Sequence, residues 1–384
     1  MDGFNFTKEE LNRYARHFAI PEFGLSGQQK LKDSKVLVVG AGGLGSPVLL
    51  YLAAAGVGTL GIVDFDTVDL SNLQRQVLYN VEDIGQSKAL LAKKRLLAMN
   101  PNLNIRVYQE AFTKDNALEL VAQYDVVADG TDNFPTRYLV NDACVLQGKV
   151  NVYASIFRFE GQVSVFNLTK EDGSRGPNYR DLFPAPPPPD MVPNCAEGGV
   201  LGVLPGIIGS LQACEVIKVL TGVGEPLSGR LFLFDAAAFT TRVLKFPINP
   251  ALEIKGLIDY DEFCGIPSQK IAEEEGELSV QSLAKMQEAG EDFFLLDVRE
   301  AYEYEADHMG GKLIPLGNLP DSIAVLPRDK KIVVHCRSGQ RSKKAVQLLA
   351  AKGFSKVYNL TGGILAWREA YGPSEIKLNS NTTV

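Results

Sequence analysis

The stretch Val36-Leu37-Val38-Val39-Gly40-Ala41-Gly42-Gly43-Leu44-Gly45-Ser46 decides the fold of the first part of the chain. Its four consecutive β-branched or leucyl residues indicate a buried parallel strand. The run then breaks into glycines and continues as a predicted helix from Pro47 to Ala55. Glycines let a backbone approach a phosphate closely, and the free amides and positive dipole end of the helix face that phosphate. The stretch therefore predicts an anion-binding strand, turn and helix.

The glycine spacing alone leaves the class of nucleotide open. Gly40, Gly42 and Gly45 match the pattern G-x-G-x-x-G, and Asp64 follows a second predicted strand, Leu60 to Val63. An acid at that distance is expected to bind the ribose of a dinucleotide. An NAD-dependent or flavin-dependent oxidoreductase is therefore one hypothesis, and a glycine turn without a ligand is the plain alternative.

Size and composition limit the class of protein. The 384 residues suggest two or three domains, and the 45% hydrophobic and 22% charged content is ordinary for a soluble globular protein. The formal net charge of −7 argues against a general nucleic-acid binder. The polar start, Met1 to Glu10, predicts no signal peptide, and glycines with Pro47 interrupt the uncharged run Gly40 to Val63. We expect a cytoplasmic protein without a membrane span.

The cysteines are too widely spaced to suggest a disulfide framework or a zinc site. No two of them form a C-x-x-C pair, and they stand at Cys144, Cys195, Cys214, Cys264 and Cys336. One or two reactive thiols in a reducing compartment fit this pattern best.

Charged residues after the second strand favour a triphosphate over a dinucleotide. Asp64-Phe65-Asp66 leads into Ser71-Asn72-Leu73-Gln74-Arg75-Gln76, and Lys88 begins a further predicted helix. A dinucleotide enzyme has no evident need for these cations, whereas cleavage of a triphosphate requires fixed positive charge near the phosphates. A lysine at a helix start opposes the helix dipole, which suggests that Lys88 meets a ligand. A solvated lysine is the alternative.

The segment Asp125 to Asn133 reads as a strand that ends in an acidic loop. Strand ends in open α/β sheets face the ligand crevice, so Asp132 is a candidate ligand for Mg²⁺. Asp132 or Asn133 could instead cap the predicted helix Phe134 to Leu146.

Two further candidates lie on either side of this region. A proline-rich stretch, 183–193, leads into Asn194-Cys195-Ala196-Glu197-Gly198-Gly199, where Cys195 is either a nucleophile or an inert loop cysteine. Near the start of the chain, Arg13 and Arg16 share a face of a predicted helix, Leu11 to Phe18. A solvated basic face is the alternative for these arginines.

A second α/β pattern begins near Glu277, after a predicted linker, 249–276. Its strand Lys331 to His335 runs into Cys336-Arg337-Ser338-Gly339-Gln340-Arg341-Ser342 and then a predicted helix to Ala351. Backbone amides, two arginines and a helix N-terminus all stabilise a thiolate. Cys336 is therefore the sharpest nucleophile candidate in the chain.

Residues 5–248 resemble the MoeB/ThiF family, the adenylyltransferases that activate ubiquitin-like sulfur carriers and are related to ubiquitin-activating enzymes. The matching motifs occur in family order at 13–16, 40–46, 64–66, 71–76, 85–88, 131–133 and 194–200. Residues 277–372 resemble a rhodanese domain through Leu296-Asp297-Val298-Arg299, Cys336 to Ser342 and Gly362 to Trp367. The expected fold is a Rossmann-like α/β domain with a mostly parallel sheet, residues 1–248, a linker, a smaller α/β rhodanese domain and a tail, 373–384.

The resemblance implies roles for individual residues. Gly43 would contact the phosphates of ATP, Asp64 the ribose, and Asp132 Mg²⁺; the implied nucleotide site also includes Ser71, Asn72, Leu73, Gln74, Arg75, Lys88 and Asn133. Arg16 would reach into the site of a neighbouring subunit, which implies a homodimer. Cys195 matches the position at which some family members form a covalent adduct with the carrier.

The sequence departs from the family at the structural zinc site. Members usually carry two C-x-x-C pairs, but the corresponding positions here are Asn178 with Asp181, and Leu252 with Lys255. We predict that no zinc is bound.

The resemblance implies a two-stage reaction. The C-terminal Gly-Gly carboxylate of the carrier is adenylated by Mg-ATP, and a persulfide on Cys336, loaded by a donor such as a cysteine desulfurase, then converts it to a thiocarboxylate. Molybdopterin, thiamine and tRNA-thiolation carriers all end in Gly-Gly and stay open as substrates. Cysteine phosphatases have a loop one residue longer than Cys336–Arg341, so a phosphatase is the less favoured alternative for this half. A carrier-binding scaffold without catalysis is a third hypothesis, which the intact site residues argue against.

Overall fold

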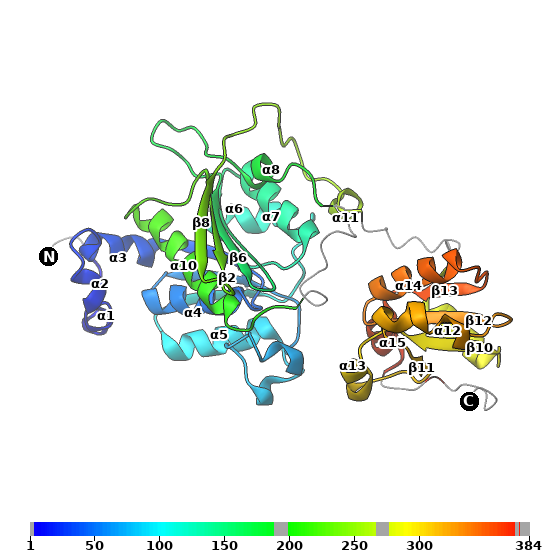
Figure 1. Cartoon of the computed structure of the whole chain (residues 1–384). Coiled ribbons are helices and arrows are strands. Elements are labelled where there is room, and N and C mark those ends of the chain that lie inside the picture. The colour runs from blue at the N-terminus through cyan, green and yellow to red at the C-terminus, as the bar shows by residue number, and fades with distance from the viewer. Residues whose placement is uncertain (1–3, 188–198, 266–275, 373–375, 377–384) are drawn as a thin grey trace. The chain divides into compact units, whose positions relative to one another are not determined.

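The computed structural model describes residues 4–187, 199–265, 276–372 and 376. These residues fall into two compact units, Met1–Ser268 and Gln269–Val384, and each is described by itself. Figure 1 labels many of the elements of both units. In chain order the first unit contains α1 (Lys8–Arg13), α2 (Ala15–Phe18), α3 (Gly24–Asp33), β1 (Lys35–Val39), α4 (Gly45–Ala55), β2 (Thr59–Val63), η1 (Leu70–Asn72), η2 (Val81–Asp83), α5 (Lys88–Met99), β3 (Asn104–Tyr108), α6 (Ala117–Ala122), β4 (Val126–Asp129), α7 (Phe134–Leu146), β5 (Val150–Phe157), β6 (Glu160–Phe166), α8 (Tyr179–Leu182), α10 (Leu204–Thr221), β7 (Arg230–Asp235), β8 (Thr240–Lys245) and α11 (Tyr260–Phe263).

The eight-stranded sheet of the first unit has the order β3-β2-β1-β4-β5-β6-β7-β8. Strands β1 to β5 pair in parallel, whereas β5 to β8 pair antiparallel. The predicted α/β fold with a mostly parallel sheet is confirmed. The chain moves outward from β1 through β2 to β3 and then returns to the other side of β1 at β4, so the ligand crevice is expected between β1 and β4.

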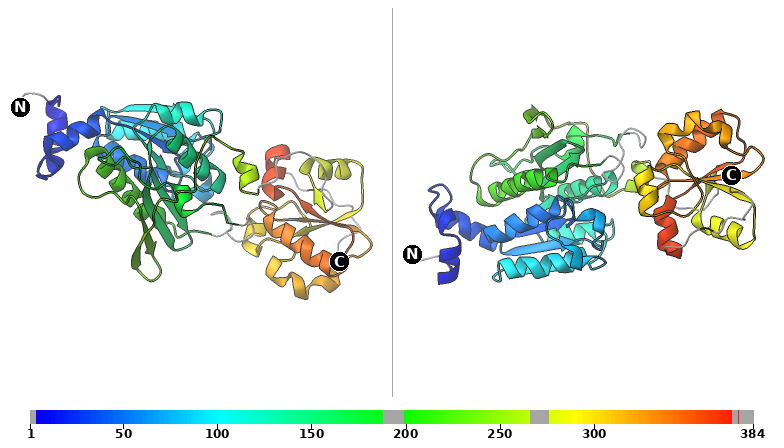
Figure 2. Two further views of the ribbon diagram at one scale, coloured as in Figure 1. Left: turned by 90° about the horizontal axis from the view of Figure 1, so that it is seen from above. Right: turned by 60° about the horizontal axis from the view of Figure 1, so that its bottom comes forward.

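Strand β1 explains why the sequence opens on an unbroken hydrophobic run. Val36 and Val38 pack into one core cluster with residues of α4 and α5, whereas Leu37 and Val39 pack into another with residues of α6 and α7. Helices therefore cover both faces of the sheet, as Figures 1 and 2 show. A strand covered on both faces needs apolar residues at every position.

Two glycines fix the turn between β1 and α4. Gly40 has φ +92°, a conformation that side chains rarely adopt, and a Cβ on Gly45 would lie 1.9 Å from the carbonyl oxygen of Gly40. The start of α4 therefore packs directly against the loop, and the residues just before it, Gly42 to Leu44, lie at the crevice.

Helix α10 is long and apolar enough to cross a membrane by length and composition alone. Its residues instead pack against α4, β5 and β6, and Leu204, Ile208 and Gln212 are fully buried. This contact pattern is that of a core helix.

The structure differs from the sequence-based expectation at two places. The predicted helix Leu11 to Phe18 is broken at Tyr14, so Arg13 and Arg16 belong to two short helices, α1 and α2, and the prediction of one continuous helix is wrong. Within the predicted linker 249–276, α11 packs against α7, and Tyr260 and Cys264 are buried in the core of the first unit. The predicted domain boundaries stay predictions.

The second unit is a smaller parallel α/β unit. It contains β9 (Glu277–Leu278), α12 (Val280–Glu288), β10 (Phe293–Asp297), α13 (Ala301–Ala306), β11 (Lys312–Leu313), η3 (Leu316–Asp321), η4 (Ile323–Val325), β12 (Lys331–His335), α14 (Gln340–Ala351), β13 (Val357–Leu360) and α15 (Gly363–Tyr371). All pairs in its sheet, of order β11-β10-β12-β13-β9, are parallel. The central strand β12 delivers Cys336 at its carboxyl end.

Candidate functional site

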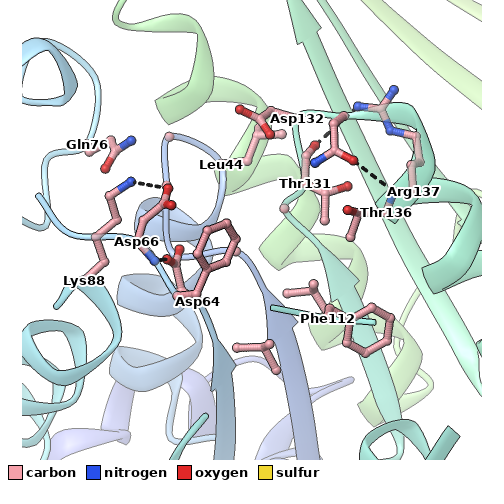
Figure 3. A pocket seen from close by; sticks show the side chains of 18 of the residues that line it. Leu44, Asp64, Asp66, Gln76, Lys88, Phe112, Thr131, Asp132, Thr136 and Arg137 are labelled. Carbon is pink, nitrogen blue, oxygen red and sulfur yellow. Dashed lines mark hydrogen bonds and ion pairs between the residues drawn. The ribbon is translucent and has the colours of Figure 1, made fainter. Parts of the chain in front are cut away.

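A pocket opens at the carboxyl ends of β1, β2 and β4 (Figure 3). The glycine loop forms one wall, and the loop after β4 forms the opposite wall. Six of the nucleotide-site residues that the resemblance implied line this pocket, namely Gly43, Asp64, Arg75, Lys88, Asp132 and Asn133. The expected crevice between β1 and β4 thus contains a concave site with charges of both signs.

Asp64 lies at the end of β2 and is held in place by backbone amides. Its carboxylate oxygens accept hydrogen bonds from the amides of Ala41, at 2.7 Å, and Asp66, at 2.8 Å. The residue is 8% exposed, and burial raises the pKa of its carboxyl above the ordinary value. Asp64 therefore fixes the glycine loop relative to β2, and a hydroxyl of a bound ligand can still reach the free lone pairs of its oxygens.

Lys88 points into the pocket from the first residue of α5 (Figure 3). Its ammonium lies 2.9 Å from an Asp66 carboxylate oxygen that belongs to a half-exposed side chain, whereas Lys88 itself is 5% exposed. The hydroxyl of Tyr79 lies 2.9 Å from the carbonyl oxygen of Ala41 and 3.2 Å from the carbonyl oxygen of Lys88, either of which can accept its proton. Tyr79 therefore connects α5 to the glycine loop. A nearly buried lysine with a solvent-facing partner suits an exchange of that partner for a phosphate.

Some residues of the segment 71–76 line the pocket, and the others do not. Arg75 lines the pocket, and its guanidinium donates to the carbonyl oxygen of Ser71 at 2.9 Å. Ser71 and Asn72 instead complete hydrogen bonds with Asp69 around η1. Leu73 and Gln74 do not line the pocket either, and the Gln74 side chain lies beside Gly202. Of these predicted site residues, Arg75 therefore lines the pocket. Four others do not: Ser71, Asn72, Leu73 and Gln74.

In the loop after β4, one residue caps α7 and a different residue is the candidate metal ligand. Asn133 caps α7, because its side-chain oxygen accepts from the amide of Thr136 at 2.9 Å. Thr131 donates to the buried Asp129 from both its amide and its hydroxyl. Asp132 is left exposed at the pocket wall. Among the described residues no group of three or more acidic, histidine or cysteine side chains forms a metal cage. A single carboxylate still fits Mg²⁺, which takes few protein ligands when it bridges substrate phosphates.

Two polar side chains that the sequence analysis passed over also line the pocket. Gln76 is 4% exposed, and its buried oxygen has no hydrogen-bond partner among the described residues. Arg137 lies one turn into α7, with its guanidinium 5.4 Å from the centres of the Phe134 and Tyr153 rings. Gln76 directly follows Arg75, and Arg137 follows Asn133 by four residues, so their spacing from the predicted motifs was the available signal.

Two predicted site residues are not brought to this pocket. Arg16 lies on α2, is exposed, and does not line the pocket of its own chain. Cys195 lies outside the described residues. Both assignments stay predictions.

The second site is the loop after β12. The Cys336 sulfur accepts from the amide of Gly339 at 3.2 Å and lies 3.4 Å from the hydroxyl of the buried Ser342. Gly339 has φ +95° and begins α14, which explains the glycine in the loop. Cys144 provides the contrast: both cysteines are buried, but Cys144 lies among apolar side chains of the first unit, and burial raises the pKa of its thiol well above the ordinary value. Hydrogen-bond donors aimed at sulfur distinguish Cys336 from a merely structural cysteine.

At the first of the two positions where family members carry a zinc-binding C-x-x-C pair, the residues present form hydrogen bonds. Asn178 donates to Asp181 from its backbone and side-chain amides, at 2.6 and 2.8 Å, and Asp181 accepts from the amide of Asn249 at 2.8 Å. Asparagine, aspartate, leucine and lysine do not make the usual zinc ligand set. The prediction of no zinc rests on this donor set.

Comparisons with known proteins match both units. The ThiF family model matches residues 14–253, and the rhodanese-like domain model matches residues 279–370. A probable adenylyltransferase/sulfurtransferase MoeZ of Mycobacterium tuberculosis is 47% identical over 96% of each chain. A sulfur carrier protein adenylyltransferase of Thermus thermophilus is 53% identical over 68% of this chain and 99% of its own length.

A solved structure supports the fold of the first unit. The crystal structure of PaaA superposes with a TM-score of 0.54 at 25% identity, and the match covers 64% of this chain and 77% of that chain. The glycine loop, the charged pocket and the cysteine loop are thus found in a chain that belongs to the ThiF family and carries a rhodanese-like domain.

Proposed function

We propose that this protein adenylates the C-terminal glycine of a ubiquitin-like sulfur carrier and then transfers sulfur to it from Cys336, which yields a thiocarboxylate. One observation carries the proposal: a single chain holds both a pocket lined by Arg75, Lys88 and Asp132 and a thiol that accepts from the amide of Gly339 and faces the Ser342 hydroxyl. The relatives named adenylyltransferase/sulfurtransferase support this pairing. Membership in the ThiF family disfavours the oxidoreductase hypothesis.

In the first stage the pocket binds ATP as substrate. The backbone at Gly43 and the cations of Arg75 and Lys88 would hold the phosphates, and Asp64 would accept from a ribose hydroxyl. The carrier carboxylate would attack the α-phosphorus, a new phosphorus–oxygen bond would form, and pyrophosphate would leave. Asp132 would hold Mg²⁺, whose chemistry there would be to neutralise phosphate charge. Lys88 would exchange Asp66 for the phosphates as charge develops on them.

Four residues behind the pocket have a supporting role in this proposal. Ser71 and Asn72 order η1 through Asp69, which positions Arg75, and Leu73 and Gln74 would continue this support. Asn133, which lines the pocket, would lie beside the nucleotide. Arg16 would act in the site of a second copy of the chain, which makes the protein a homodimer.

In the second stage the persulfide on Cys336 attacks the acyl carbon of the adenylate. A carbon–sulfur bond forms and AMP leaves, so the carrier becomes joined to Cys336 through an acyl disulfide. A thiolate then attacks the Cys336 sulfur, the sulfur–sulfur bond breaks, and the carrier leaves as a thiocarboxylate. We propose Cys195 as that thiolate and a cysteine desulfurase as the source of the persulfide.

We propose molybdopterin biosynthesis in the cytoplasm as the setting of this reaction. A thiamine carrier or a tRNA-thiolation carrier would undergo the same chemistry, because the reacting group is the same C-terminal glycine.

Exchange of radioactive pyrophosphate into ATP tests the first stage. We expect exchange only when a Gly-Gly carrier is present, and we expect Asp132→Ala to abolish it. Carrier-independent tight binding of NAD(H), without ATP binding, would instead support an oxidoreductase.

A further inference from the structure

The surroundings of Cys336 contain several arginines that are already paired with carboxylates. Arg299 is 4% exposed and contacts Asp297 at 2.6 to 3.0 Å, and Arg368 contacts Asp307 at 2.5 to 3.0 Å. Neither pair adds net charge to the site. The charge available to a sulfur donor therefore depends on the two arginines of the cysteine loop itself.

Arg341, the second of these arginines, is neutralised by Glu303 of α13. The two side chains form a bidentate pair at 2.6 and 2.7 Å, and the Glu303 side chain is only 13% exposed. The residue after Arg341 is Ser342, whose hydroxyl lies 3.4 Å from the Cys336 sulfur. The pair is thus formed by the residue that directly precedes this serine at the start of α14.

Glu303 is held in this position by contacts other than Arg341. One of its carboxylate oxygens also accepts from the amide of Glu300 at 3.0 Å, and its carbonyl oxygen accepts from Arg299 at 3.4 Å. Burial alone would raise the pKa of Glu303, but the hydrogen bond from Arg341 brings the pKa below the ordinary value. Glu303 is therefore negatively charged at neutral pH.

Arg337 is the remaining cation of the loop. Within the part of the chain that the structure describes, its buried Nε has no hydrogen-bond partner, and no ion pair to a carboxylate is found for it. Its carbonyl oxygen accepts from the amide of Leu365 at the start of α15. The loop thus offers one uncompensated positive charge, where its sequence suggests two.

Two classes of sulfur donor place very different charge in such a site. When the Cys336 thiolate attacks thiosulfate, a sulfur–sulfur bond forms, the bond to the sulfonate breaks, and sulfite leaves as a dianion. Three negative charges are then present before and after the step. When the thiolate attacks the outer sulfur of an organic persulfide, R–S–SH, the products are Cys336–S–SH and R–S⁻, and the reacting groups carry only one negative charge if R is uncharged. The thiosulfate reaction therefore depends more steeply on local positive charge.

We propose that Glu303 is a specificity-determining residue that disfavours dianionic donors of the thiosulfate class and favours organic persulfides at Cys336. The proposal rests on the sulfur-transfer stage of the proposed function. It assigns to Glu303 the role of a repulsive element against the wrong donor.

The test compares two donors on the full-length protein and its Glu303→Gln variant. Glutamine keeps the size of the side chain and an acceptor oxygen but removes the charge. The measured quantity is the rate at which Cys336 gains one sulfur atom, followed by mass spectrometry after acid quench, with thiosulfate and with 2-hydroxyethyl persulfide, whose organic group is uncharged. We expect the ratio of kcat/KM for thiosulfate to that for the persulfide to rise about tenfold or more in Glu303→Gln, and to fall again at high salt.

Matched variants separate charge from structure. Glu305→Gln removes an exposed charge from the same helix and should leave the ratio at the wild-type value. Arg341→Gln should lower the ratio, because Glu303 is then uncompensated, and the double variant should return it toward the wild-type value. An unchanged or lowered ratio in Glu303→Gln, or an equal rise in Glu305→Gln, would overturn the proposal. Failure of Cys336 to accept sulfur from either donor would instead refute the proposed sulfur-transfer stage.

Discussion

Two loops in this molecule connect a central parallel strand to a helix, one between β1 and α4 and one between β12 and α14. Both contain glycines with positive φ, Gly40 and Gly339, and both present backbone amides at a helix N-terminus. In the first loop every side chain is small or apolar, and the charges come from elsewhere, chiefly Arg75 and Lys88. In the second loop the reacting atom is the side chain of the loop itself, Cys336.

This difference explains how one architecture serves two reactions. An anion that arrives as substrate needs an open binding loop and cations that can change partner, the role that we propose for Lys88. A loop that is to hold sulfur covalently needs a cysteine of its own and hydrogen-bond donors that face the cysteine sulfur. Variants in the two loops should therefore impair separate activities, and the following predictions test that separation.

Cys336→Ala is expected to have the largest effect. It removes the sulfur that must carry the persulfide, so transfer of sulfur from thiosulfate to cyanide should be lost completely. Carrier-dependent ATP–pyrophosphate exchange should persist, because the pocket at β1 and β4 is unchanged. Thiocyanate formation and exchange are measured on the same preparation; loss of both activities from a folded variant would contradict the division of labour.

Lys88→Ala should impair the other stage. The loss of a nearly buried cation that meets developing phosphate charge typically costs about 10²- to 10³-fold in rate, so exchange should fall by that amount while thiocyanate formation stays. Lys94→Ala, on the exposed side of the same helix α5, is the control. Equal losses in both variants would refute the role given to Lys88.

Gly363→Ala should weaken the second loop through a steric clash that adds to backbone strain. A Cβ at this position would lie 2.4 Å from the carbonyl oxygen of Cys336, and Gly363 has φ +58°. We expect roughly tenfold slower sulfur transfer and a free energy of unfolding lowered by about 1–3 kcal/mol. Gly290→Ala, which has a positive φ but no neighbour within 4 Å, isolates backbone strain from the clash. Sulfur-transfer rates that match in the two variants would contradict the packing argument.

The smallest predicted effect is a pH dependence of stability in the second unit. His335 is fully buried behind Cys336, and burial lowers its pKa from 6.5 to about 4, against a nearby Asp297 that raises it. The unfolded chain binds a proton at His335 more readily than the folded chain does. The free energy of unfolding is therefore unaffected by His335 above pH 6.5 and decreases as the pH falls toward 4. We expect a loss of about 1–3 kcal/mol, seen in denaturant unfolding of the second unit, and a flatter profile in His335→Gln. An equally steep profile in that variant would assign the loss to other groups.

Local sequence patterns were enough to predict the strand–turn–helix structure of both loops. Each loop lies within one strand–turn–helix unit, so Gly40, Asp64 and Cys336 could be recognised from neighbours in the chain, and the predicted helix Phe134 to Leu146 is confirmed as α7.

Contacts between distant segments were beyond those patterns. The pair Glu303–Arg341 joins residues 38 positions apart, and the hydrogen bond from Tyr260 to Asp142 joins residues 118 apart. Neither has a periodic signal, because each depends on how the elements pack. The entry of Gln76 into the pocket, with Gln74 outside it, likewise depends on the course of the chain after η1.

The most direct test of the account is the mass of the carrier tail after reaction. Wild-type protein, ATP, a persulfide donor and a Gly-Gly carrier should produce a carrier in which one sulfur replaces one oxygen. Cys336→Ala should stop at the adenylated carrier. A carrier that never gains sulfur from the wild-type protein, or that gains it equally fast from Cys336→Ala, would contradict the central claim that the two loops act in sequence on one tail.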